Sequence, residues 1–380
     1  MFNTCKEAIT YIEGKRTKRT FLQFQETIKK YNIPISLPYT IHIAGTNGKG
    51  STVQFVREIL MQHGYQVGTF TSPYMIQHND RICINGKPIS DVSLLFYINK
   101  LETIIEKEQL SMFEIDVLIM LLYFHDNHLD FCVIETGIGG KTDKTNVINS
   151  NISVITNIGF DHQEMLGNTL NEIAIQKAGI IKKNQVFITS EDNNELLSIF
   201  SKICDKHNTK MEVVKKEEGK QFVYENNNYI LNTDSSYQIY NAKLAVAITN
   251  KCIKTNANKV QQAITNFQYP GRFERIGNIY LDGAHNIDGI RALKQSIDNL
   301  KSSSIVIIFS ALSDKDSSSM LQLLKDYPTF PASFDDDRSK SQAPNYQDVL
   351  KQIDKEYETI VITGSLHFIS EVRKHLKDNV

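Results

Sequence analysis

Three glycines and a lysine are concentrated in residues 40–53, which read T-I-H-I-A-G-T-N-G-K-G-S-T-V. Gly45, Gly48 and Gly50 allow backbone N–H groups to turn toward one point, and Lys49 adds a full positive charge. A helix that begins here contributes roughly half a positive charge at its N-terminus. This combination of donors and positive charge is typical of a loop that binds phosphate.

The spacing of this loop departs from the general G-x-x-x-x-G-K-[ST] pattern. Only Thr46 and Asn47 lie between the first two glycines, and a glycine separates the lysine from Ser51. An alternative interpretation is a plain strand-to-helix turn with an exposed lysine. The glycine count favours phosphate binding, but other segments must support that choice.

A strand and a helix are expected to position the loop. Thr40–Ala44 alternates and is rich in β-branched residues, as in a buried strand. Ser51 is a favourable N-cap for a following helix. The apolar positions of that helix are Val53, Phe55, Val56, Ile59 and Leu60.

A carboxylate stands at the end of a second apolar strand, Phe131–Glu135. In a parallel α/β sheet, ligands bind at the carboxyl ends of the strands. Glu135 is therefore suited to hold Mg²⁺ while nucleotide phosphates supply further oxygens. The alternative is a capping or solvated glutamate, but the glycines that follow allow the loop to bend close to a ligand. Lys141 and Asp143 could reach into the same crevice.

Two further candidates follow the next strand, Ile152–Ile158. His162 is expected at the same sheet edge as Glu135, where it could bind a second cation, although a lone histidine is more often a packing residue. Lys177 borders the apolar stripe of a helix over Leu170–Ala178. Such a lysine usually extends toward solvent. The alternative is that it points inward and acts as an anion.

The alternation of strand-like and helical segments indicates parallel sheets covered by helices. Tyr269-Pro270-Gly271 interrupts the pattern, and a second strand-and-helix series follows it. We therefore place a domain boundary there, which gives one domain over residues 1–270 and a smaller one over 271–380. A chain of 380 residues with 41% hydrophobic content is long enough for both cores.

Composition excludes several functional classes. The net charge of -1 gives no general attraction to nucleic acid or to an anionic membrane. Met1–Thr20 lacks the apolar core of a signal peptide, and the longest apolar run, Val117–Phe124, is far shorter than the roughly 20 residues of a membrane span. The five cysteines form no C-x-x-C pair, which favours the reduced cytoplasm.

Ordered motifs from His42 to Phe368 resemble those of the folylpolyglutamate synthase and dihydrofolate synthase family, within the Mur-type ligase superfamily. The segments that carry this resemblance are His42–Ser51, Thr71–Pro73, Asn79–Asn85, Glu135–Asn146, Asp161–Lys182, Pro270–Glu274, Asp282–Asn286, Ala311–Asp316 and Thr363–Phe368. The resemblance implies a P-loop-type ATPase domain with a mostly parallel sheet, followed by a smaller Rossmann-like α/β domain.

The resemblance also implies roles for single residues. The predicted metal ligands, for the two Mg²⁺ ions that the resemblance implies, are Ser72, Glu135 and His162. The predicted ATP-binding residues are Thr46, Asn47, Gly48, Lys49, Gly50, Ser51, Asn241, Arg272 and Asp282. The predicted folate and glutamate residues are Ser111, Met112, Phe113, Glu114, Asp143 and His285. Lys177 matches a carbamylated lysine, which carries a negative charge, and the expected catalytic residues are Lys49, Lys177 and His285.

The implied reaction is an ATP-driven ligation that adds L-glutamate to the γ-carboxylate of a reduced folate through an acyl phosphate. The alternatives are dihydrofolate synthesis from dihydropteroate, activity on both acceptors, a peptidoglycan-precursor ligase of the same superfamily, and a nucleotide-binding regulator without catalysis. Departures from the family pattern at Tyr74, Met75, Asp80, Lys141 and Asp116 lie toward the folate side and leave the acceptor open. A monomer is expected. His285 and the carbamate are alternative bases for the glutamate amine.

Overall fold

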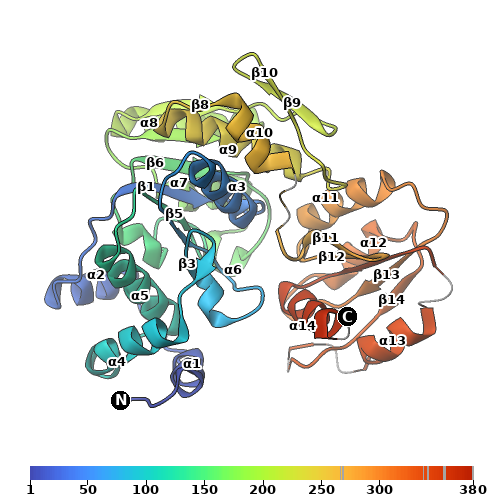
Figure 1. The fold of residues 1–380 in the computed structure, drawn as a ribbon, viewed down its shortest axis with the longest axis horizontal. Coiled ribbons are helices and arrows are strands. Elements are labelled where there is room, and N and C mark those ends of the chain that lie inside the picture. Colours follow the sequence, from blue (N-terminus) through green and yellow to red (C-terminus); the bar gives the residue numbers. More distant parts are fainter. Residues whose placement is uncertain (266, 268, 337, 340–341, 354–356, 379–380) are drawn as a thin grey trace. The chain divides into compact units, whose positions relative to one another are not determined.

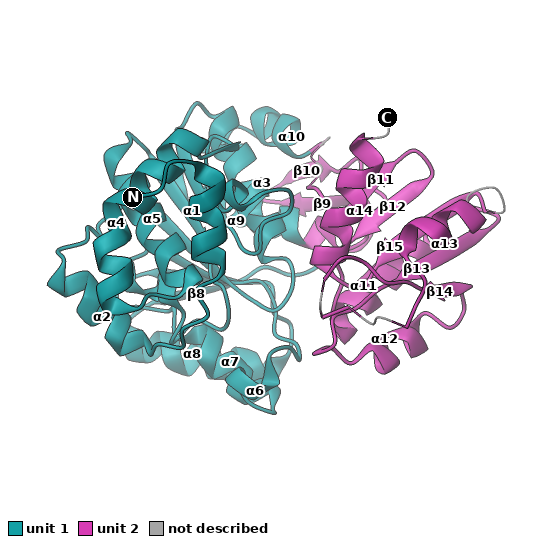
Figure 2. Ribbon diagram, turned by 90° about the horizontal axis from the view of Figure 1, so that it is seen from below, with its two compact units in different colours: residues 1–216, 241–264 teal, residues 217–240, 265–380 magenta. Residues whose placement is uncertain are grey.

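The computed structural model describes residues 1–265, 267, 269–336, 338–339, 342–353 and 357–378. The chain divides into two compact units, shown in Figure 2. Unit 1 contains Met1–Lys216 and Asn241–Ile264, and unit 2 contains Glu217–Tyr240 and Thr265–Val380. The assignment of an ATP-binding domain to residues 1–270 and a glutamate-binding domain to residues 271–380 stays a prediction.

Unit 1 is built on an eight-stranded sheet in the order β4-β3-β2-β5-β1-β6-β7-β8 (Figure 1). The six strands from β2 to β8 in this order are parallel, and β3 and β4 are antiparallel. The strands are β1 (Tyr39–Ala44), β2 (Val67–Phe70), β3 (Ile82–Ile84), β4 (Lys87–Pro88), β5 (Phe131–Glu135), β6 (Ile152–Ile155), β7 (Val186–Thr189) and β8 (Lys210–Val213). Because β5, β1 and β6 are parallel neighbours, the loops that follow them emerge at one sheet edge.

Helices cover the sheet of unit 1. α1, α2, α4 and α5 pack in a core with Cys132 and Ile134 of β5, whereas α7 and α8 pack against Ala44, Ile155 and Phe187. The helices are α1 (Cys5–Glu13), α2 (Phe21–Lys30), α3 (Lys49–Gln62), α4 (Asp91–Glu108), α5 (Met112–Asp126), α6 (Gln163–Leu166), α7 (Leu170–Ala178), α8 (Asn194–His207), α9 (Gln238–Cys252) and α10 (Ala257–Thr265), with 3-10 turns η1 (His78–Arg81) and η2 (Lys144–Val147). α9 and α10 cross the boundaries between the units.

Unit 2 contains a five-stranded sheet in the order β11-β12-β15-β13-β14 and a two-stranded hairpin, β9 and β10. β11 is antiparallel to β12, and the other four strands are parallel. The strands are β9 (Gln221–Tyr224), β10 (Asn227–Ile230), β11 (Arg272–Ile276), β12 (Ile279–Asp282), β13 (Ile305–Phe309), β14 (Thr329–Pro331) and β15 (Thr359–Thr363). The helices are α11 (Ile287–Asp298), α12 (Ser317–Leu323), α13 (Tyr346–Ile353) and α14 (Leu366–Asp378).

The side chains of β13 alternate between the two cores of unit 2, as the period of a strand requires. Ile307 and Phe309 pack with α11 and α12, whereas Val306 and Ile308 pack with α13 and α14. The five-stranded sheet is therefore covered on both faces. None of the helices in the described ranges is long and apolar enough to cross a membrane.

One local expectation is wrong. Ser51 is not the N-cap of α3, because the helix begins at Lys49 and its N-cap is Gly48, with φ 83°. The left-handed conformation of Gly48 turns the chain into the helix three residues earlier than the sequence pattern indicated. Ser51 thus lies in the first helical turn.

Candidate active site

The loop between β1 and α3 presents helix N–H groups at the carboxyl edge of the sheet. The first regular helical bond joins the N–H of Thr52 to the carbonyl of Gly48, at 2.9 Å. The N–H groups of the residues from Lys49 to Ser51 are therefore directed out of the N-terminus of α3, where they and the helix dipole favour an anion. The predicted residues Gly48, Lys49, Gly50 and Ser51 form this turn.

Asn241 lies against the turn, although 193 positions separate it from Gly48 in the sequence. A Cβ atom added to Gly48 would stand 2.4 Å from Oδ1 of Asn241. Asn241 is on α9 and is 7% exposed. The structure thus brings together two segments that the sequence pattern assigned separately to nucleotide binding.

Thr46 and Asn47 hold the loop in place. The N–H of Thr46 donates to the carbonyl of Asn157, and the N–H of Asn47 donates to Oδ1 of Asn157, at 3.0 and 2.9 Å. Oγ1 of Thr46 donates to the carbonyl of Gly159 and accepts from its N–H. These bonds give both predicted residues a structural role, and their contact with nucleotide stays a prediction. The sequence analysis missed Asn157, because no motif distinguishes it from a surface asparagine.

Lys49, Ser72 and Glu135 meet at the mouth of this loop. Nζ of Lys49 is 3.9 Å from Oε1 of Glu135, and the N–H of Ser72 donates to Oε2 of Glu135 at 3.2 Å. Glu135 is the last residue of β5 and is 4% exposed. Parallel pairing of β5 with β1 places the carboxylate beside the loop that follows β1.

Lys177 points inward, as the alternative interpretation of the sequence predicted. It is 4% exposed, and its Nζ donates to the carbonyl of Gly45 at 2.8 Å. Burial, reinforced by the charge of Lys49, lowers the pKa of Lys177 to about 7, although Asp161 and Asp143 act in the opposite direction. The buried amine is therefore partly neutral near pH 7.

The donors near the loop fit Mg²⁺. This ion binds through one or two carboxylates, takes its other oxygens from phosphates and water, and needs no all-protein cage. Glu135 supplies a carboxylate and Ser72 lies beside it. No group of three or more His, Cys, Asp and Glu side chains suited to a metal occurs within the described ranges. The side chain of His162 is 37% exposed, with Nε2 3.8 Å from Oδ2 of Asp161.

The residues predicted to line the folate pocket begin α5. Ser111 is its N-cap, and Ser111 and Glu114 form a capping box. Glu114 is fully buried, and its Oε1 also pairs with Arg19 and Lys144 at 3.3 and 3.0 Å. These contacts stabilise the start of the helix, so Ser111 and Glu114 have structural partners. Met112 is the first helical residue.

Phe113 and Asp143 converge on Gly137. A Cβ atom at Gly137 would lie 2.7 Å from Cζ of Phe113 and 3.1 Å from Oδ2 of Asp143, so only glycine allows this approach. Asp143 accepts from the N–H groups of Ile138 and Thr145 at 2.9 and 3.0 Å. Burial raises the pKa of Asp143. The contact of these predicted residues with substrate stays a prediction.

A buried ionic cluster lies in the segments that depart from the family pattern. Nε2 of His78 faces Oδ1 of Asp116 at 2.8 Å, and Nδ1 faces Oε1 of Glu13 at 3.0 Å. Both partners can only accept when ionised, so the geometry suits an imidazolium that donates twice. Burial alone lowers the pKa of His78, and Arg81 acts the same way, but Asp116 and Glu13 outweigh both and raise it to about 9.

We expect this cluster to make unfolding pH-dependent. Because the pKa of His78 is higher in the folded protein than its ordinary value of 6.5, its stabilisation is fully present below pH 6.5 and is lost as the pH rises through 9. The contribution of His78 to the free energy of unfolding should fall by on the order of 2 kcal/mol over that interval, seen as the difference between the wild type and a variant without this imidazole. Denaturant titrations from pH 6 to 10 measure this change. His78→Gln should remove it, and the exposed-site variant His125→Gln should retain it. An equal slope in all three proteins would contradict the assignment.

In unit 2, Asp282 ends β12 and lies in a polar cluster. It is 2% exposed, accepts from the hydroxyl of Tyr237 at 2.5 Å and pairs in register with Arg272 on β11. Burial raises the pKa of Asp282, whereas the hydroxyl of Tyr237 and the charge of Arg272 lower it in part. Tyr237 was missed by the sequence analysis, because it lies 45 positions away and belongs to no motif.

His285 follows β12, and its Nδ1 lies 2.8 Å from the carbonyl of Gly283. A carbonyl only accepts, so Nδ1 carries the proton and the lone pair of the neutral ring is on Nε2. Arg272, Asp282 and His285 thus belong to one region of unit 2, whereas Lys49, Glu135, Lys177 and Asn241 belong to unit 1.

A glycine-rich loop with a carboxylate and a buried lysine beside it, on a mostly parallel sheet, is the arrangement expected from the resemblance to Mur-type ligases. The family model described as "Mur ligase middle domain" matches residues 43–274. A dihydrofolate synthase/folylpolyglutamate synthase of Bacillus subtilis is 34% identical, over 99% of this chain and 100% of the relative.

Two solved structures are also similar. A folylpolyglutamate synthase in complex with AMPPCP and folate has a TM-score of 0.85 at 27% identity, over 98% of this chain and 99% of that one. A bifunctional folylpolyglutamate synthase/dihydrofolate synthase with Mn, AMPPNP and L-glutamate bound shares the fold, with a TM-score of 0.86 at 22% identity, over 99% of this chain and 98% of that one.

The chain therefore belongs to the dihydrofolate synthase/folylpolyglutamate synthase family. The predicted family, the α/β fold of the Mur ligase type and the assignment to ATP-dependent amide-forming ligases are confirmed.

Proposed function

We propose that this chain adds L-glutamate to the γ-carboxylate of reduced folates, with ATP as the phosphoryl donor. The observation that carries this proposal is the meeting of Lys49, Ser72 and Glu135 at the N-terminus of α3, next to the buried Lys177. Dihydropteroate is a second candidate acceptor, because the Bacillus subtilis relative is named for both activities.

The first step needs charge neutralisation more than acid–base catalysis. An oxygen of the folate carboxylate attacks the γ-phosphorus of ATP, and the bond to the β–γ bridging oxygen breaks to release ADP. Lys49 and the N–H groups at the start of α3 would hold the phosphates. Glu135, Ser72 and His162 would hold Mg²⁺, which would screen the repulsion between the carboxylate and the triphosphate. We propose that two Mg²⁺ ions bind.

The second step forms the amide. The amine nitrogen of glutamate attacks the acyl carbon of the acyl phosphate, and inorganic phosphate leaves. The amine must first lose an ammonium proton. Nε2 of His285 carries the lone pair of the neutral ring and would accept this proton. The carbamate of Lys177 is the alternative base.

Lys177 is suited to carbamylation because burial favours its neutral amine. The amine nitrogen would attack the carbon of carbon dioxide. It would then lose a proton, which gives the carbamate. This change replaces a second cation near Lys49 with an anion, so it removes the repulsion that helps to lower the pKa of Lys177. A carboxylate-like group in this place would orient the metal ligands.

We expect activity to fall on the acid side of pH 7. With a pKa of about 7, Nζ of Lys177 is mostly protonated below that pH and cannot form a carbamate. Turnover should decrease by about tenfold for each unit below pH 7, and added bicarbonate should restore part of it at pH 7. Steady-state rates from pH 5.5 to 9, with and without bicarbonate, measure this profile. A rate that is flat with pH and indifferent to bicarbonate would argue against the carbamate.

Phosphate release from Mg·ATP with L-glutamate tests the function. Tetrahydrofolate monoglutamate and dihydropteroate are compared as acceptors, and mass spectrometry identifies each product. Release with the folate only, with a mass gain of one glutamyl residue, supports a dedicated polyglutamylating enzyme. Dihydrofolate formation supports the second candidate, and silence with both acceptors rejects ligase activity on these substrates. A monomeric state and a cytoplasmic location stay predictions.

A further inference from the structure

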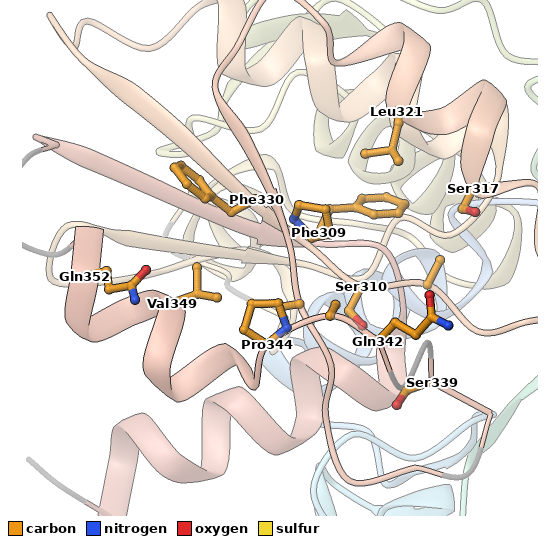
Figure 3. A pocket seen from close by; sticks show the side chains of 14 residues that line it. Phe309, Ser310, Ser317, Leu321, Phe330, Ser339, Gln342, Pro344, Val349 and Gln352 are labelled. Carbon is orange, nitrogen blue, oxygen red and sulfur yellow. The ribbon is translucent and has the colours of Figure 1, made fainter.

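A cavity of about 730 Å³ lies within unit 2 (Figure 3). Its walls come from the carboxyl ends of β13 and β14, from α12 and α13, and from Ser339, Gln342, Ala343 and Pro344. The volume is within the range of about 300–1,000 Å³ typical of small-molecule sites. None of the residues assigned to the ligase reaction is among the described lining residues.

The cavity lies at a point where the order of the strands in the sheet reverses: β14 lies on one side of β13, and β15, the next strand in the chain, lies on the other side. α12, which follows β13, packs in the core that contains Phe309. α13 follows β14, and its residues Val349 and Ile353 pack in the core on the opposite face of the sheet. Neighbouring parallel strands whose following helices cover opposite faces leave a crevice at their carboxyl ends, and ligands of α/β proteins bind at such points. The position therefore favours a binding site independently of the volume.

An unpartnered hydroxyl is the second observation. Ser310 follows β13 and is 3% exposed, and its Oγ has no hydrogen-bond partner among the described atoms. The N–H of Ser310 already donates to the carbonyl of Thr363 at 3.0 Å. A buried hydroxyl without a hydrogen-bond partner is energetically unfavourable. Because Ser310 forms part of the cavity wall, a ligand there could supply the missing bond.

The other described lining residues indicate the charge and the shape of a ligand that would fit the cavity. Phe330 on β14 is 37% exposed, which leaves an aromatic face at the cavity. The described lining residues are serine, glutamine, proline and apolar side chains, with no charged side chain among them. A triphosphate or a chain of glutamates would lose its hydration there without a counter-charge. The lining therefore suits a neutral, flat molecule with a hydrogen-bonding edge.

We propose that this cavity binds a neutral planar heteroaromatic compound of one or two fused rings, which stacks on Phe330 and hydrogen-bonds to Oγ of Ser310. Two hydrogen bonds hold described residues beside the cavity: the N–H of Ser333 donates to the carbonyl of Pro344 at 2.8 Å, and Oγ of Ser339 donates to the carbonyl of Phe334 at 2.9 Å. This site is separate from the proposed ligase function and does not depend on it.

The test titrates the full chain with quinazolin-4-one and follows binding by ligand-observed NMR. We expect a Kd of about 1 mM or tighter. Ser310→Ala should raise the Kd by about 3- to 10-fold, because it removes the hydroxyl and leaves the volume nearly unchanged. Ala343→Trp should abolish binding by filling the cavity. Ser318→Ala, an exposed serine of α12 outside the lining, is the matched control and should bind like the wild type.

Three outcomes would overturn the proposal. These are no binding by the wild type at 10 mM probe, unchanged binding by Ala343→Trp, and equal binding of benzoate, which has a similar size but carries a charge. Thermal unfolding checks that Ala343→Trp is folded, and Leu321→Trp on α12 replaces it if it is not. All readouts are binding constants, so loss of ligase activity would leave the result unaffected.

Discussion

Lys177→Ala should lower turnover by at least roughly 10²-fold and leave the fold intact. Nζ of Lys177 contacts the carbonyl of Gly45 and lies in the field of Lys49, so this position influences both the phosphate loop and the proposed metal site. Alanine removes the group that would carry the carbamate. Steady-state kinetics, with circular dichroism as the check on folding, measure the effect.

Two comparisons separate a catalytic loss from a packing loss. Burial also lowers the pKa of Lys182, to about 8, but its Nζ donates to the carbonyls of Asn146 and Ile148, which tie two loop residues together. Lys182→Ala should therefore reduce stability more than turnover. Acetate or formate should rescue Lys177→Ala in part, because either anion can occupy the vacated space, and should not rescue Lys182→Ala. Near wild-type turnover of Lys177→Ala would remove the carbamate proposal.

The elements that carry the site were predictable because their patterns are local. β5 ends at Glu135 and α7 spans Leu170–Ala178, both as the sequence predicted. A run of apolar β-branched residues that ends in a carboxylate is marked by its own composition. Which side Lys177 would face was not settled by the pattern, since the residue borders the apolar stripe. The packing of α7 against β1 and β6 decided it.

Contacts between distant segments could not be predicted. Asn157 fixes the loop through Thr46 and Asn47, and Tyr237 binds Asp282, yet neither residue belongs to a motif. The start of α3 was misplaced for a related reason. Serine has the stronger N-cap preference in general, but the left-handed φ of Gly48 is set by the whole turn. Sequence rules describe neighbours along the chain, whereas these bonds depend on strand order.

The turn at Gly48 leads to the second large expected effect. Gly48→Ala should lower turnover by about 10²-fold and weaken binding of a non-hydrolysable ATP analogue by at least about tenfold. The new Cβ would stand 2.4 Å from Oδ1 of Asn241, at a residue with φ 83°, so both the turn and the asparagine must move. That movement displaces the first N–H groups of α3, which are the proposed phosphate donors. Calorimetric titration with AMPPCP measures the affinity.

Gly64→Ala is the matched control for backbone strain. Gly64 also has a left-handed φ, 94°, but a Cβ there would meet nothing within 4 Å. Each variant should lose about 1–2 kcal/mol of stability from its left-handed φ. The free energy of unfolding, measured with denaturant, should therefore fall by a similar amount in both variants from this cause. Only Gly48→Ala should lose affinity for the nucleotide. If it binds AMPPCP as tightly as Gly64→Ala does, the phosphates are held elsewhere, because a displaced helix N-terminus cannot keep the same N–H groups on the same anion.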